Sequence, residues 1–240
     1  MIMESHKHEE HKHAEHHVEH KPAWLKSNYR VYLIAALVVL VLFNQWQISS
    51  LNNLSPAGGS GTPLTAISDV IPTGIPLVYG AELGVSYDDI SPTDQNRANN
   101  AIAKLSAYDK SMELTGSDMQ RYINVLYNLE GGISCEYCCG AKSIITADGR
   151  PACGCAHSYS MRGLAKYLIK SHPSQFTDEE ILEELGKWKT LYFPGIISQK
   201  AAVLKEKGIE LNYINLASNK YRGIEKGVEV GSSGSMVGGC

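Results

Sequence analysis

The sequence of 240 residues lacks the short motifs that mark several common enzyme classes. It contains no G-x-S-x-G nucleophile motif, no H-E-x-x-H zinc-protease motif and no glycine-rich loop for phosphate groups. A C-x-x-C-H motif is also missing, because Cys138 is followed by Cys139 and Gly140, so a c-type haem is not expected. These absences give no reason to expect an enzyme.

A large excess of charge is missing as well. Lys and Arg total 22 and Asp and Glu total 25, so the sequence offers no electrostatic argument for nucleic acid as a partner. Residues 49–68 contain no charged side chain. With 43% apolar residues, the chain can bury one sizeable core and still carry tails.

The longest apolar run is Val31–Phe43, which carries no charge. It is short for a membrane span, which needs about 20 residues, but it can be extended to Ile48. We therefore predict a transmembrane anchor over residues 31–48. The basic residues that flank this run lie only on its amino-terminal side, so the positive-inside rule places residues 1–30 in the cytoplasm and the rest outside. These basic residues are Lys21, Lys26 and Arg30.

A cleaved signal peptide is the alternative interpretation of the apolar run, because 13 residues also suit the apolar region of such a peptide. Ser55-Pro56-Ala57 matches a cleavage site poorly, and a lead of 30 residues is long. We favour the uncleaved anchor. In both cases the main domain is exported.

The amino-terminal segment holds seven of the nine histidines. Histidine-rich tracts bind divalent metals, so this tail is interpreted either as a cytoplasmic metal buffer or as a solvated, disordered segment of mixed charge. The sequence does not choose between the two. The seven positions are His6, His8, His11, His13, His16, His17 and His20.

The rest of the chain divides by composition into a linker, a domain and a tail. Residues 49–65 form a flexible linker, residues 66–226 an exported helical domain, and residues 227–240 a Gly/Ser-rich tail that ends in Cys240. Apolar periodicity and capping residues predict the helices of the domain. They are expected over 91–108, 117–129, 158–171, from a capping box at Thr177 to Pro194-Gly195, and over 198–207.

Five of the six cysteines fall between Cys135 and Cys155. Two groups, C-x-x-C-C and C-x-C-x-H, are separated by a segment that contains the tight-turn pair Asp148-Gly149. We predict a small β-hairpin there, followed by a helix that begins near His157. The fold class expected is therefore an α-rich α+β protein, with an amino-terminal transmembrane helix and a Cys/His knuckle in the exported domain.

Thiolate and imidazole groups suit Zn²⁺ in tetrahedral geometry, and thiolate-rich sets also hold Cu(I). The cluster offers more ligands than one tetrahedral ion needs. The minimal set of four is Cys135, Cys138, Cys153 and Cys155. All six candidate metal ligands are Cys135, Cys138, Cys139, Cys153, Cys155 and His157.

The order of knuckle, hairpin and ligand-bearing helix over Cys135–Tyr167 resembles treble-clef zinc fingers. The segment from Ala152 to His157 is similar to the CYCGC-type motif of small exported lipoproteins, although the lipobox cysteine is missing. The stretch GGISCEYCCG…ACGCAHSYSMRGLAKYLIK resembles a group of uncharacterised archaeal membrane proteins. None of these resemblances implies an established activity.

Three functions follow from the cluster. The first is capture, buffering or transfer of zinc or copper outside the membrane, beside a membrane transporter or another membrane protein. The second is thiol–disulfide exchange with Cys135 and Cys138 as the redox pair. The third is an interaction module with a purely structural zinc. Disulfide bonding alone, with Cys240 as a sixth partner, is the plainer alternative in an oxidising compartment.

Overall fold

The computed structural model describes residues 31–43, 70–226 and 236–239. The chain divides into two units, Met1–Leu54 and Ser55–Cys240, and each is described by itself. In the first unit, residues 31–43 form a helix whose large apolar side chains are exposed along its length. Within the described ranges, no helix combines the length and apolar character needed to cross a membrane. The predicted cytoplasmic tail, the linker and most of the carboxy-terminal tail lie outside the described residues.

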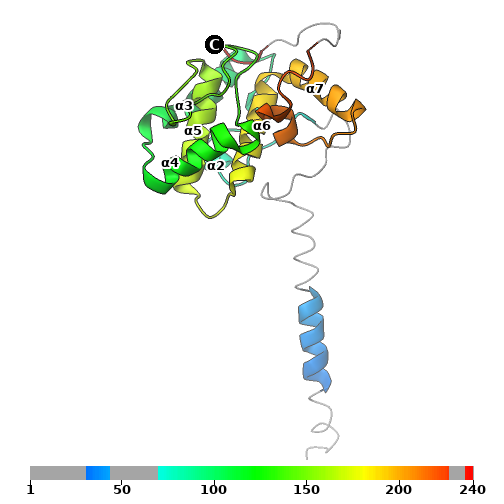
Figure 1. Ribbon diagram of the computed structural model, residues 1–240. Coiled ribbons are helices and arrows are strands. Elements are labelled where there is room, and N and C mark those ends of the chain that lie inside the picture. Colours follow the sequence, from blue (N-terminus) through cyan, green and yellow to red (C-terminus); the bar gives the residue numbers. More distant parts are fainter. Residues whose placement is uncertain (1–30, 44–69, 227–235, 240) are drawn as a thin grey trace, which may run out of the picture. The chain divides into compact units, whose positions relative to one another are not determined.

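The second unit is mostly helical, with long connecting loops (Figure 1). Helix α5 packs along α3 and also against α6, while α6 packs against the short α8. The predicted mostly helical domain is therefore confirmed. The α-helices are α2 Gly80–Leu83, α3 Gln95–Ser111, α4 Gly116–Ile123, α5 Ala156–Ser171, α6 Asp178–Tyr192, α7 Pro194–Glu206 and α8 Tyr213–Ala217.

Helices α3 and α5 approach closely because of a glycine. A Cβ atom on Gly163 of α5 would lie 2.1 Å from the carbonyl oxygen of Leu105 in α3, so a larger residue would push the helices apart. Beside this contact, buried Arg162 of α5 donates from Nε to Asp109 of α3 over 2.8 Å. A buried ion pair of this kind is stable only when both partners are present, so it fixes the register of the two helices.

Helix α6 begins as its sequence predicts. The Thr177 hydroxyl accepts from the backbone N–H of Glu180, and the Glu180 carboxylate accepts from the backbone N–H of Thr177. This reciprocal capping box satisfies two amide groups that the first turn leaves unpaired. The apolar stripe expected on this helix is fully buried, and it comprises Ile181, Leu182, Leu185 and Trp188.

The segment before α3 wraps the buried end of α6. Glu184 of α6 accepts hydrogen bonds from the hydroxyl groups of Tyr79 and Tyr87, at 2.7 and 2.6 Å. The indole N–H of Trp188 donates to the Tyr79 hydroxyl over 2.7 Å. These bonds pair polar groups that would otherwise be buried without partners.

Several helix boundaries differ from those predicted. Helix α3 starts after Asp94, which accepts from the backbone N–H of Arg97, so Asp94 and not Ser91 is the N-cap. The second predicted helix divides into α4 and a π-helical turn, η3 Asn124–Asn128, followed by a short 3-10 turn, η4 Leu129–Gly131. Pro194 was expected only to end α6, but it is also the first residue of α7. Proline is tolerated at this position because the first backbone N–H groups of a helix have no partner within the helix.

The predicted β-hairpin is reduced to a bridged turn. Ile145 and Pro151 form one isolated β-bridge, and Gly149 has the positive φ of 85° that the turn requires. Among the described residues, no stretch forms a regular strand. The fold is therefore helical, with isolated bridges in place of the small β element expected.

Candidate metal centre

The first half of the centre enters the core through a glycine turn. Gly132 has a φ of 74°, and a Cβ there would lie 2.2 Å from the Leu126 carbonyl oxygen, so only glycine fits. The next residue, Ile133, forms a β-bridge with Ser218 near the carboxy-terminal end of the domain. This path leads directly to Cys135, whose side chain is fully buried.

The second half is held by the bridged turn and by Arg162. The Arg162 guanidinium donates to the carbonyl oxygen of Cys153 over 2.8 Å and to that of Ile144 over 3.2 Å. Cys155 then caps α5, because its sulfur accepts from the backbone N–H of Ser158 over 3.4 Å. The fold thus delivers both halves of the cysteine cluster to one point at the start of a helix.

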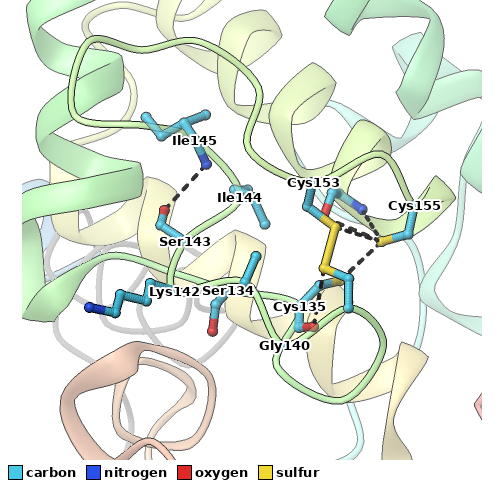
Figure 2. Close-up of a disulfide and its surroundings, with 12 residues drawn as sticks. Ser134, Cys135, Gly140, Lys142, Ser143, Ile144, Ile145, Cys153 and Cys155 are labelled. Carbon is cyan, nitrogen blue, oxygen red and sulfur yellow. Dashed lines mark hydrogen bonds between the residues drawn. A yellow bond between two sulfur atoms is a disulfide. The ribbon is translucent and has the colours of Figure 1, made fainter.

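Three of the predicted ligands converge there. The ligand atoms of Cys135, Cys155 and His157 all lie within 4.8 Å of one another, and the three residues are buried. The sulfur atoms of Cys135 and Cys155 are 3.5 Å apart (Figure 2). Two thiolates at Zn–S distances of about 2.3 Å in a tetrahedron are separated by about 3.8 Å, so the observed spacing suits a metal ion.

Two other predicted ligands are joined to each other. Cys139 and Cys153 form a disulfide, drawn as the yellow bond in Figure 2. Cys153 nevertheless stays next to the group of three, with its sulfur 3.6 Å from that of Cys155. Cys138 lies partly buried in the turn that begins at Cys135; it is also disulfide-bonded, and the group of three does not include it. The arrangement thus combines the metal and disulfide interpretations of the cluster.

The hydrogen bond between Cys135 and Cys155 separates their acidities. This hydrogen bond, together with those to His157 and Ser158, lowers the pKa of Cys155 from 9.0 to about 3. The same hydrogen bond, together with burial, raises the pKa of Cys135 well above its usual range. The surroundings of Cys155 therefore favour its thiolate, which is the form that binds metal ions.

The imidazole of His157 is held by a part of the chain far away in sequence. Its Nε2 lies 2.8 Å from the carbonyl oxygen of Val237, an atom that can only accept. With Nε2 paired to this carbonyl, a bound metal ion would be held through Nδ1, in place of the hydrogen bond that His157 makes with Cys155. A metal-binding histidine commonly donates its other N–H to a carbonyl in this way. The ring also packs against Tyr192 and Phe193, with centroids 4.5 and 5.2 Å away.

Sequence reasoning missed three groups that support the centre. Ser158 was detectable, because a small polar residue three positions after Cys155 is where a capped helix would present its amide and hydroxyl. Val237, which pairs with His157, had no such signal. Neither had Lys189, which lies close enough to interact with Cys135 and whose pKa is lowered by burial. Their positions depend only on tertiary packing.

Comparisons with known proteins add no assignment: no family model, curated protein or solved structure matches this chain.

Proposed function

We propose that this protein binds zinc, or alternatively Cu(I), at Cys135, Cys155 and His157, in order to capture, buffer or pass on the metal. The observation that carries the proposal is the convergence of three buried ligand atoms from two separated segments of the chain within 4.8 Å. Two thiolates and one imidazole match the ligand preference of a borderline or soft ion.

The number of ligands favours transfer over a purely structural site. Structural zinc sites have four protein ligands, whereas sites with three keep one position open for an exchangeable group. The described group supplies three, Cys135, Cys155 and His157. A metal held in this way can be handed to a partner that offers a further ligand.

We also propose that the metal-binding domain is tethered outside the membrane by residues 31–48, with residues 1–30 in the cytoplasm. The support is the uncharged apolar run at Val31–Phe43 and the restriction of nearby basic residues to its amino-terminal side. A membrane transporter or another membrane protein is then the partner that exchanges metal with the domain. The His-rich tail would meet the same ion on the other side.

Metal analysis of the purified full-length chain tests the function. We expect about one equivalent of zinc or copper in the wild type, because one group of three ligands is present. Cys135→Ser and His157→Gln should each weaken binding at least about tenfold. Cys138→Ser is the matched control, since it removes a disulfide-bonded cysteine of the same turn that the group does not include. A protein that holds no metal after reconstitution would refute the proposal.

Removal of the metal separates the transfer site from a structural zinc. Helices α3, α5 and α6 bury their own apolar core, so circular dichroism should keep its helical signal after a chelator removes the ion. Loss of that signal would instead show that the zinc is structural and that the helices serve as an interaction module.

Thiol–disulfide exchange is a second candidate, favoured by one observation. The Cys155 sulfur lies 3.6 Å from that of Cys153, which is bonded to Cys139, so a free cysteine faces a disulfide. The geometry supports exchange between Cys155 and the Cys139–Cys153 disulfide, in place of the Cys135/Cys138 pair expected from the motif. A reduced protein that cannot reduce insulin would count against it.

A further inference from the structure

We propose that the Cys139–Cys153 disulfide is a redox latch on the metal centre: its reduction frees Cys153 to become the fourth ligand beside Cys135, Cys155 and His157. This inference rests on the proposed metal-binding function and deepens it. With the latch closed the centre has two thiolates and an imidazole, and with the latch open it has three thiolates and an imidazole.

The position of Cys153 is the first support for the latch. Its sulfur lies 3.6 Å from that of Cys155, which in turn lies 3.5 Å from that of Cys135 (Figure 2). Both distances are close to the edge of about 3.8 Å that separates thiolates around one tetrahedral zinc ion. Cys153 therefore lies at the distance of a neighbouring ligand from Cys155, and its sulfur is held in the bond to Cys139.

The backbone around Cys153 is already fixed. Its carbonyl oxygen accepts from the buried guanidinium of Arg162, which is also paired with Asp109. The residue before it, Ala152, donates from its backbone N–H to the Ile144 carbonyl oxygen over 3.0 Å. Opening the disulfide therefore requires a change at the side chain but no rearrangement of the chain that carries it.

The two ends of the disulfide differ in access. Cys139 is exposed, whereas Cys153 is 6% exposed and faces the other sulfur atoms. A reductant can thus reach Cys139 first. Attack there makes Cys153 the leaving group, and the leaving thiolate is released inside the metal centre and not into solvent.

The exchange balances with a dithiol as the reductant. One thiolate of the dithiol bonds to the Cys139 sulfur, and the Cys139–Cys153 bond breaks to release Cys153 as a thiolate. The second thiolate of the dithiol then attacks the mixed disulfide, which releases Cys139 as a thiol and the dithiol as a cyclic disulfide. Two electrons pass from the dithiol to the two cysteines, and Cys153 is free to bind the metal.

Cobalt spectroscopy of the full-length chain tests the latch, because the thiolate-to-cobalt charge-transfer band grows with the number of bound thiolates. Co²⁺ is added under anaerobic conditions before and after treatment with a phosphine reductant, which introduces no competing thiol. We expect the band to rise about 1.5-fold on reduction, from two thiolates to three. The zinc affinity should rise in parallel.

Two variants and a control identify the residue responsible. Cys139→Ser leaves Cys153 without its partner, so it should show the three-thiolate band without any reductant. Cys153→Ser should stay at two thiolates in both conditions. Cys138→Ser removes the disulfide of Cys138 but keeps the one between Cys139 and Cys153, so it should still respond to reduction as the wild type does.

The outcomes distinguish the latch from the metal site itself. A band of equal intensity before and after reduction in the wild type, with Cys139→Ser no stronger, would overturn the latch and leave metal binding intact. A gain in the wild type that persists in Cys153→Ser would assign the fourth ligand to another cysteine and overturn the latch as proposed. The absence of any cobalt or zinc binding in either state would overturn the metal site and the latch together.

Discussion

The residue that follows Cys135, Glu136, is buried among cationic side chains. Its carboxylate lies 3.2 Å from the ammonium of Lys189, 3.5 Å from the guanidinium of Arg222 and 4.0 Å from the ammonium of Lys200. Burial alone would raise the pKa of Glu136, but Lys189 and Lys200 hold it below its usual value. The cluster thus keeps a buried charge next to the metal centre, where it is balanced by more than one partner.

Lys200 gives this cluster a measurable pH dependence. Burial, and then the nearby Lys189, lowers the pKa of Lys200 from 10.5 to about 8. Between those pH values the unfolded chain binds a proton that the folded chain has lost. The free energy of unfolding of the wild type should therefore rise from pH 8 to pH 10.5 by on the order of 3 kcal/mol from this group.

Lys200→Met should abolish that rise in the free energy of unfolding. At pH 7 the substitution should leave the free energy of unfolding unchanged or raise it by about 1–3 kcal/mol, because it removes the cost of burying a charge. Guanidinium denaturation of both proteins at several pH values measures the difference between their free energies of unfolding. The titration of the cysteines cancels in this difference, because both proteins contain the same cysteines. Lys205→Met, at an exposed position of the same helix, controls for net charge. Parallel pH curves for wild type and Lys200→Met would contradict the prediction.

At the scale of single elements, the two central helices begin in different ways. Helix α6 starts with a reciprocal capping box between Thr177 and Glu180. Helix α5 starts with Cys155, whose sulfur replaces the usual hydroxyl or carboxylate oxygen as acceptor for Ser158. The first cap serves the helix alone, whereas the second also directs a ligand atom into the metal centre.

The capping box of α6 can be tested by one substitution. Thr177→Ala removes the acceptor for the Glu180 amide, and we expect a loss of about 1 kcal/mol in the free energy of unfolding. Thr115→Ala is the matched control, because Thr115 is also an exposed N-cap but makes no side-chain capping bond to α4. Denaturation curves should show a smaller loss for the control; equal losses would argue against the capping box.

At the scale of the whole domain, residues 236–239 pack against the candidate metal centre. Val237 is fully buried, and its backbone N–H donates to the Tyr192 carbonyl oxygen over 2.9 Å while its own carbonyl oxygen pairs with His157. The amides of Gly238 and Gly239 donate to Gln95 and Asn99 of α3, both at 2.9 Å. A segment about 80 positions from His157 therefore orients its ring.

Removal of this segment should weaken metal binding without destroying the fold. A chain shortened by residues 227–240 loses the Val237 carbonyl that orients His157, and such supporting contacts affect metal affinity by about 10–100-fold. Deletion of Cys240 alone is the control, because it keeps residues 236–239. Competition with a chromophoric chelator measures both affinities, and circular dichroism verifies the helices. Equal affinities for the two shortened chains would exclude a role for Val237.

The amino-acid sequence by itself determined the features that depend on neighbours along the chain. The spacing of apolar residues and the Thr177 capping box predicted α6, and the helix after the second cysteine group was placed within two residues of α5 at its start. The residue types also indicated a metal-binding group among the six candidates, because thiolates and imidazole suit the same metals. The minimal set of four expected from the sequence included Cys138 and Cys153 and left out His157, which the structure brings to Cys135 and Cys155.

Tertiary structure alone decided which of these atoms meet. Spacing along the chain does not distinguish the sulfur atoms of Cys138, Cys139 and Cys153. In the folded domain, Cys153 lies beside Cys155 and is bonded to Cys139. The contact between Val237 and His157 is equally invisible in sequence. Such distances are set by the way the buried surfaces of distant segments fit together, and no local pattern of residues encodes that fit.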